Sequence, residues 1–560
     1  MTAHPPASPD PCPTLPSLAA MDRRSLLRSG VAGAAGLAAL PGLASAKAAT
    51  GFGFGVASGE PGQNSVLLWT RYAAMQDTAL TWEVSDDDSF TAIIASGTAI
   101  AKPAHDFCVK PVATGLEPGT WYFYRFIGPD GGMSDIGRTR TLPAGAVDRF
   151  RLGVFSCSNL GFGYFNAYGH AAQDNAFDLI LHLGDYFYEY NDGRYPSAAQ
   201  KVAGRAAWPD HETVVLADYR LRHASYRADP DLRRMTQLYP MILGWDDHES
   251  ANDSWTGGAE NHDPGEGDWG ARKRAAMRAY REWLPVSDAD YAAYEVGDLA
   301  TLFRLETRLG ARSEQFSVEK LLEGKGSADQ MTAALDAFRG GDFVTPERTI
   351  LGTAQENWLA DGLKASRISG TVWQVLVQQV LMGKLASPDS LLEGLAAAAP
   401  ADIKSRLQAA ALASKAGLPL NMDAWDGYPA ARDRLLASAM NADANLLVLA
   451  GDTHNAWAFD LAHDSARAGI EFGVQGVTSP GLETYLGMVP PKIMQQSLVG
   501  RNAELQWADT SQRGYMAVEL TPTQASCEWR FVSGVKSRSV ALAGKHRMVS
   551  RAGSNQLSQG

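Results

Sequence analysis

The sequence predicts an α/β layered domain, in which β-sheets are flanked by helices, preceded by a small all-β sandwich of the immunoglobulin or fibronectin type. Two observations predict this arrangement. Residues 51–145 contain short strand patterns at close spacing, separated by turn residues such as Pro61-Gly62 and Gly128-Pro129. From about residue 149, continuous apolar runs alternate with helical stretches, as in a parallel sheet with helices on either side.

The first residues of the chain predict export. Residues 1–20 are rich in proline and small residues, and we interpret Met21 as the true start. Arg23-Arg24, followed by an apolar run and the small residues Ala44-Ser45-Ala46, is typical of a twin-arginine signal with its cleavage site. We therefore expect residues 1–46 to be removed, and the mature protein to be periplasmic or secreted through the twin-arginine export machinery. The apolar run is too short to span a bilayer, so no membrane span is expected in the mature chain.

Composition restricts the class of protein further. The chain has 560 residues, 45% of them hydrophobic and 20% charged, which is ordinary for a folded protein of more than one domain. A formal net charge of -12 argues against nucleic acid or anionic membrane as a standing partner, because both attract basic surfaces. Outside the export region three cysteines remain, and a disulfide between Cys108 and Cys527 is left open.

The predicted elements follow in chain order. Strands of the sandwich are expected at 66–71, 80–84, 92–100, 107–112 and 121–127, with 138–143 as its last strand or as a linker. The second domain is expected to cover 149–540, with helices at 164–173, 268–283 and 355–366 and a buried strand at 372–381. Two Ala- and Leu-rich stretches, 313–342 and 387–418, are interpreted as helical insertions near the pocket mouth, either for packing or as a lid. Residues 541–560 are expected to form a C-terminal tail.

Four apolar runs of the second domain end in residues that can bind metals. Because parallel strands present their carboxyl ends at one edge of a sheet, we expect these ends to converge. Carboxylate, phenolate and thiolate donors favour a ferric ion, whereas several carboxylate and amide oxygens suit calcium, magnesium or manganese. The four strand ends are Ser156-Cys157-Ser158-Asn159, Gly184-Asp185-Tyr186-Phe187-Tyr188, Asp246-Asp247-His248-Glu249 and Gly451-Asp452-Thr453-His454.

In this order, and together with Leu305-Glu306-Thr307-Arg308, these motifs resemble the PhoD-like alkaline phosphatase and phosphodiesterase family. The resemblance spans roughly residues 51–535. It implies a metallophosphatase-type fold for the layered domain. It further implies Fe(3+) held by Cys157, Asp185, Tyr188 and His454, and Ca(2+), or else Mg, Mn or Zn, held by Asp185, Asp246, Asp247, Asn252 and Asp452.

Two further residues have open roles. His248 either steadies the leaving group or anchors its loop. Arg308 either pairs with an acid or reaches a substrate phosphate. The role of Asp185, by contrast, is expected to be that of a bridge between the two metals. Glu306 stands where the family more often has Asp, which weakens any ligand role at this position.

The expected function is an exported metal-dependent phosphoric ester hydrolase, similar to alkaline phosphatase D. It would cleave phosphate monoesters, diesters or both through a metal-activated hydroxide. One alternative is a phospholipase D-like phosphodiesterase of the same family. An exported iron redox protein is disfavoured, because the sequence has no Cys-x-x-Cys-His, no cysteine cluster and no Gly-x-Gly-x-x-Gly after a strand. A binding or adhesion protein that uses the sandwich is also disfavoured, because four strand ends of the second domain carry residues that can bind metals.

Overall fold

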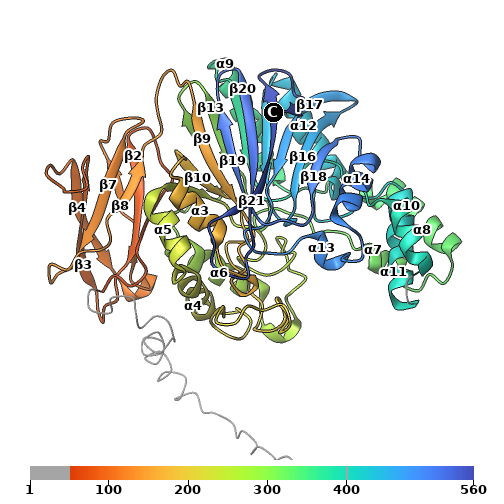
Figure 1. Ribbon diagram of the computed structural model, residues 1–560, viewed down its shortest axis with the longest axis horizontal. Helices are drawn as coiled ribbons and strands as arrows, with labels where there is room; N and C mark the ends of the chain where they lie inside the picture. The colour runs from red at the N-terminus through yellow and green to blue at the C-terminus, as the bar shows by residue number, and fades with distance from the viewer. Residues whose placement is uncertain (1–50, 399–400) are drawn as a thin grey trace, which may run out of the picture. The chain divides into compact units, whose positions relative to one another are not determined.

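Two β-sheets packed face to face form the centre of the structure, a computed structural model that describes residues 51–398 and 401–560 (Figure 1). The predicted export region lies outside these residues. One sheet has eleven strands and the other seven. Their facing side chains share one hydrophobic cluster, which includes Leu152, Leu181, Val375 and Leu449.

The eleven-stranded sheet has a parallel centre, in which β10 pairs with β9 on one side and with β11 on the other. In spatial order its strands are β22 (Leu557–Gln559), β21 (Leu542–Arg551), β20 (Gln524–Val532), β19 (Gly514–Leu520), β9 (Phe150–Phe155), β10 (Leu179–His182), β11 (Pro240–Leu243), β1 (Val56–Gly59), β2 (Ser65–Arg71) and β5 (Cys108–Val109), with β6 (Val112–Thr114) also paired to β2.

The seven-stranded sheet has its own parallel centre of β13, β14, β15 and β17. In spatial order its strands are β12 (Ala292–Val296), β13 (Ala300–Arg304), β14 (Trp373–Val377), β15 (Leu446–Ala450), β17 (Ala466–Gly473), β16 (Ala456–His463) and β18 (Leu505–Asp509). Its outer face packs against α9 (Gly352–Ile368), α12 (Pro429–Asn441) and α14 (Pro491–Arg501).

Helices cover only one face of each sheet. In β10, Leu179 and Leu181 point into the cluster between the sheets, whereas Ile180 joins a second cluster with helices. Those helices lie together beside β9 and β10 in Figure 1 and are α3 (Asn166–Asp174), α4 (Leu216–Arg227), α5 (Pro230–Leu238) and α6 (Trp269–Trp283). The predicted burial of both faces is therefore present, but the expected helices on either side are wrong, because the second sheet replaces one helical layer.

The N-terminal sandwich shares a sheet with the rest of the protein. Its separate four-stranded sheet contains β4 (Ala95–Ala101), β3 (Thr78–Ser85), β7 (Trp121–Ile127) and β8 (Gly137–Arg140). Its other layer is the β1–β2–β5–β6 edge of the eleven-stranded sheet, where β1 runs parallel to β11. The predicted strand at 107–112 is divided into β5 and β6 by Pro111, which cannot donate a ladder hydrogen bond.

The two predicted insertions are helical and pack on each other. The first contains α7 (Val318–Leu322) and α8 (Ala328–Gly340), and the second contains α10 (Asp389–Ala398) and α11 (Ala401–Lys415). Leu335 and Phe338 of α8 meet Ala413 of α11 in a small cluster of their own. This shows the packing role, and a lid role stays a prediction.

One other prediction needs correction, and the open question of a disulfide is answered. The expected tail at 541–560 is mostly β-structure, because β21 pairs along the whole of β20 and buries Met548 in the cluster between the sheets. Cys108 and Cys527 are both free, since they lie on β5 and β20 towards opposite ends of the same sheet. Among the residues described, no helix is long and apolar enough to cross a membrane.

Candidate metal centre

The strand ends converge across the two sheets. The turn after β9 bonds to the turn after β10, through Cys157 N to Gly184 O at 3.2 Å and Ser158 N to Asp185 O at 2.8 Å. From the other sheet, the Sγ of Cys157 lies 3.7 Å from the carbonyl oxygen of Asp452. The predicted convergence is therefore present, although it joins two sheets rather than one.

Left-handed backbone occurs at four of the predicted ligands. The φ angles are 61° at Cys157, 53° at Asp185, 65° at Asp452 and 63° at His454. Residues with a Cβ adopt this region at an energetic cost, which the surrounding structure must offset, and such positions cluster at functional sites. Three of these side chains, Cys157, Asp185 and His454, meet in one group, and Asp452 belongs to an adjoining group.

The first group of candidate ligands contains Cys157, Asp185 and His454, whose ligand atoms all lie within 4.8 Å of one another. The Tyr188 hydroxyl donates to Asp185 Oδ2 at 2.9 Å and lies 3.1 Å from His454 Nε2. His454 Nδ1 lies 2.8 Å from the carbonyl oxygen of Pro480, which holds the proton on Nδ1 and leaves the Nε2 lone pair for a metal. All four residues predicted to bind iron are thus gathered.

The second group contains Asp246, Asp247 and Asp452, again within 4.8 Å of one another. Asp185 joins Asp247 in a third group of the same size, so it lies between the first two. Among the residues described, Asp185 Oδ1, Asp246 Oδ2 and Asp247 Oδ1 are buried and have no hydrogen-bond partner. Buried carboxylate oxygens without donors fit cations, because an unpaired buried charge is costly.

Burial and mutual repulsion shift the pKa values of these carboxylic acids. The pKa of Asp185 is raised well above its usual range, mainly by burial and also by the neighbouring carboxylates. Burial likewise raises the pKa of Asp246 to about 6, against the opposing effect of Arg308. Cations at the centre would reverse both effects, since they stabilise the ionised carboxylates.

Arg308 is completely buried and faces the acids. Its guanidinium donates to Asp246 and to Asp423, and its Nη2 lies 3.4 Å from Asp452 Oδ1. Of the two predicted roles, this geometry favours pairing with acids. Glu306 accepts from the backbone N–H of Arg308 at 2.8 Å, so it shapes the loop.

His248 is held by a buried carboxylate. Its Nδ1 lies 2.6 Å from Glu189 Oε2, and its ring lies against Tyr188 with 4.2 Å between centroids. The charges of Asp247 and Glu189 outweigh burial and hold the pKa of His248 well above its usual value. The same residue has a ring nitrogen within 4.8 Å of carboxylate oxygens of Asp185 and Asp247, so both predicted roles remain open.

Asn252 is the predicted ligand with the weakest support. Its side-chain amide donates to Glu260 at 3.1 Å, and its backbone N–H donates to Glu189 at 2.8 Å. Its contact with a metal stays a prediction.

Sequence reasoning missed three residues that hold the centre together. Glu249 accepts backbone hydrogen bonds from Asp185, Tyr186 and Asp246, and so ties two ligand-bearing turns to each other. Its place directly after Asp246-Asp247-His248 was a signal that could have found it. Asp423 binds both Arg308 and Arg312, and Ser479 donates to the Tyr188 hydroxyl at 2.7 Å, but neither belongs to a strand-end pattern.

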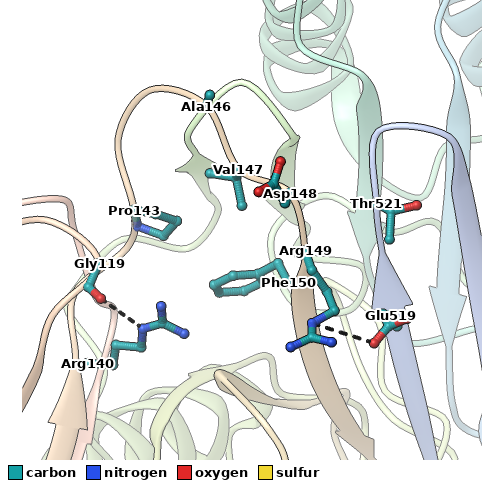
Figure 2. A pocket seen from close by; sticks show the side chains of 10 residues that line it. All are labelled: Gly119, Arg140, Pro143, Ala146, Val147, Asp148, Arg149, Phe150, Glu519 and Thr521. Atoms are coloured by element: carbon teal, nitrogen blue, oxygen red, sulfur yellow. Dashed lines mark hydrogen bonds and ion pairs between the residues drawn. The ribbon is translucent and has the colours of Figure 1, made fainter.

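A surface pocket of about 730 Å³ lies elsewhere (Figure 2). It is lined by the start of β9 at Phe150, whereas Cys157 follows the other end of that strand. Its arginines are engaged: Arg140 pairs with Asp178, and Arg149 lies 3.9 Å from Glu519. The pocket is therefore not part of the candidate metal centre.

A helix-covered double sheet whose strand ends carry adjoining metal-ligand groups around a shared aspartate is the arrangement of a metallophosphatase. Comparison with known proteins agrees. The family model described as PhoD-like phosphatase matches residues 152–529, and the model of the PhoD-like phosphatase N-terminal domain matches residues 37–143. The chain belongs to the PhoD-like phosphatase family, which confirms the resemblance and the enzyme class predicted from the sequence.

Two relatives are similar over most of the chain. Alkaline phosphatase D of Bacillus subtilis (strain 168) is 31% identical over 523 residues, which cover 88% of this chain and 79% of that protein. A solved structure titled "Structure of PhoD" matches with a TM-score of 0.74 and 30% identity, over 91% of this chain and 92% of the other. The predicted fold, a β-sandwich followed by an α/β layered domain, is confirmed.

Proposed function

We propose that this protein is an exported hydrolase of phosphate monoesters, diesters or both, and that Asp185 bridges two metal ions in its active site. The observation that supports this most directly is the position of Asp185, which belongs to one ligand group with Cys157 and His454 and to another with Asp247 and His248, and Asp247 in turn joins the group of Asp246 and Asp452. One carboxylate shared by two groups is the arrangement that a two-metal hydrolytic centre requires.

The donor chemistry supports two different metals. Cys157, Asp185, Tyr188 and His454 would hold Fe(3+), whereas Asp185, Asp246, Asp247, Asn252 and Asp452 would hold Ca(2+), with Mg, Mn or Zn as alternatives for the second ion. Burial raises the pKa of the Cys157 thiol and of the Tyr188 phenol well above their usual values, so only a strongly charged cation would keep both deprotonated. Such ions, when bound, supply charge neutralisation for the phosphoryl oxygens and acidify bound water.

The chain's own residues orient this chemistry. Pro480 fixes the His454 ring, and Glu249 fixes the turns that carry Asp185 and Asp246. Arg308 offsets part of the negative charge of the second group. His248, held by Glu189 and close to Asp185 and Asp247, would steady the negative charge that develops on a leaving oxygen.

The test combines metal analysis with activity. The protein, isolated after export, is expected to contain iron and a second metal and to hydrolyse a phosphate monoester, a diester or both when the two are assayed side by side. Asp185→Asn should lose both metals and at least a thousandfold in activity, about 4 kcal/mol of barrier, while circular dichroism shows an unchanged fold. Activity retained within about tenfold would place the centre elsewhere.

A further inference from the structure

Arg308 and Asp423 form a buried ion pair beside the second group of candidate ligands. Arg308 follows β13, whereas Asp423 follows the second helical insertion. Asp423 Oδ2 lies 2.5 Å from Arg308 Nη1. The pair therefore joins two segments that are far apart in the sequence, and neither of its members belongs to a candidate ligand group.

The guanidinium of Arg308 is shared between Asp423 and the candidate ligands. Its Nε donates to Asp246 Oδ1, and its Nη2 lies 3.4 Å from Asp452 Oδ1 and 3.8 Å from Asp247 Oδ1. Its Nη1 donates to Asp423, on the other side. A guanidinium is planar and always charged, so the position of this charge depends on how the four carboxylates divide its nitrogens.

A cation bound by the second group would repel this guanidinium. Among the described residues, Asp246 Oδ2 and Asp247 Oδ1 are buried without a hydrogen-bond partner, so these oxygens can face an ion. A positive charge held on the same carboxylates weakens their attraction for that ion. The effect is strong in a buried site, because charges there are poorly screened. The affinity of the second site therefore depends on where Arg308 is held.

Asp423 is itself fixed in place. Its Oδ1 lies 2.5 Å from Arg312 Nη2, and its carbonyl oxygen accepts from the same guanidinium. Its backbone N–H donates to Asn421 Oδ1 at 3.0 Å. Arg312 is held in turn by a hydrogen bond of 3.1 Å to the Thr307 carbonyl and by the Tyr428 ring, whose centroid lies 4.7 Å from its Cζ. The remaining carboxylate oxygen of Asp423 is thus presented in one position.

We propose that Asp423 is a positioning residue that sets the affinity of the second metal site, because it holds the Arg308 guanidinium off the carboxylates that would bind the ion. The inference rests on the proposed function, since it requires a second ion at Asp246, Asp247 and Asp452. Without the charge of Asp423, Arg308 would pair more closely with these carboxylates and oppose the ion. Because the ion pairs of Arg308 lie in the second group and with Asp423, iron content should not depend on this contact.

The test compares Asp423→Asn with Asp426→Asn in the full exported protein. Both changes replace a buried carboxylate by an amide in the segment after the second insertion, but Asp426 accepts from Leu385 N at 2.8 Å and serves the backbone there. A chelator removes the second metal, and Ca(2+) or Mn(2+) is titrated back while iron content and melting temperature are recorded. Asp423→Asn should raise the dissociation constant at least about tenfold at unchanged iron content, whereas Asp426→Asn should keep it within about threefold.

A double-mutant cycle shows whether the effect passes through Arg308. In an Arg308→Gln background, Asp423→Asn should change the dissociation constant by less than about threefold, because no guanidinium is left to hold. Arg308→Lys is the alternative background if the glutamine variant does not fold, since a single ammonium group cannot reproduce the forked contacts with Asp423 and Asp246.

The outcomes separate this inference from the proposed function. A parent protein that binds the second ion, with an Asp423→Asn variant of unchanged affinity, would overturn the inference and leave the proposed function standing. An equal loss of affinity with and without Arg308 would also overturn it, because Asp423 would then act on the ion directly through its charge. A parent protein that contains iron but binds neither Ca(2+) nor Mn(2+) would overturn the inference together with the proposed second ion.

Discussion

Tyr188 and Cys157 are the two proposed iron ligands whose bonds to a ferric ion would absorb visible light. Phenolate and thiolate both donate charge to a ferric ion, so the purified protein should be coloured. Tyr188→Phe should shift or weaken the visible band and lower iron affinity, and Cys157→Ser should change the band differently, because a different donor is lost. Absorption spectra with iron analysis of the two variants check this. A colourless and fully active protein with two other metals would contradict the ferric assignment.

Gly184 shows how closely the turns of the centre approach each other. Its φ is +104°, and a Cβ at this position would lie 2.4 Å from Asp246 Cβ and 2.6 Å from Asp246 N. Gly184→Ala should therefore push the turn after β11 away, abolish binding of the second metal and cost about 2–4 kcal/mol of stability. Thermal unfolding and metal analysis measure both effects.

Gly131 supplies the matched control. Its φ is +80°, but nothing lies within 4 Å of a Cβ built there. Gly131→Ala should cost only the strain of a left-handed alanine, about 1–2 kcal/mol, and leave metal content unchanged. Equal effects of the two substitutions would mean that backbone strain, rather than the contact with Asp246, makes Gly184 necessary.

At the scale of elements, the C-terminal strands are part of the core rather than a tail. Ending the chain after residue 552 would remove β22 with Leu557, and ending it after residue 541 would also remove β21 with Met548. We expect a graded loss of stability, about 1–2 kcal/mol for the first truncation and more than 3 kcal/mol for the second, because more apolar surface is exposed. Chemical denaturation of both truncated proteins measures the difference. If neither truncation lowers the free energy of unfolding, residues 541–560 are a tail that does not contribute to the core.

Which elements could be predicted depended on how their residues show burial. β9 could be recognised from the sequence, because its residues are almost all apolar and a turn of polar residues follows it. β21 was missed because its first six residues alternate between half-buried and exposed, and Lys545 and Arg547 look like solvated chain. Helix α4 was missed because Arg222 and Arg227 are buried in it, which conceals the apolar face.

The candidate site was easier to predict than the elements around it. The candidate ligands lie at the ends of recognisable strands, so Asp185 and Asp452 could be singled out from local patterns. Asp423 could not, because it follows a helical insertion and meets Arg308 only through the fold. Candidate ligands can be recognised from local sequence patterns. The residues that orient them can be recognised only from contacts between segments far apart in the sequence.

At the scale of the whole molecule, an apolar run shows that a strand is buried but not what covers it. β10 and β15 have the same fully buried pattern, and each faces the other sheet on one side and helices on the other. This pairing of sheets brings the turn of Asp452 to the turn of Cys157. The centre is therefore assembled only when both sheets have packed, which couples metal binding to the folding of the entire domain.

That coupling bears on export. Twin-arginine export carries folded proteins, so the protein would cross the membrane with its centre complete. Replacing Arg23-Arg24 by Lys-Lys should retain the protein in the cytoplasm, because the arginine pair is an address read by a receptor. Arg28→Lys, outside the pair, is the control and should be exported normally. Cell fractionation with iron analysis of each fraction measures this. For the Lys-Lys variant we expect metal-loaded protein in the cytoplasm. A normal periplasmic yield from that variant would refute the assignment of the twin-arginine signal.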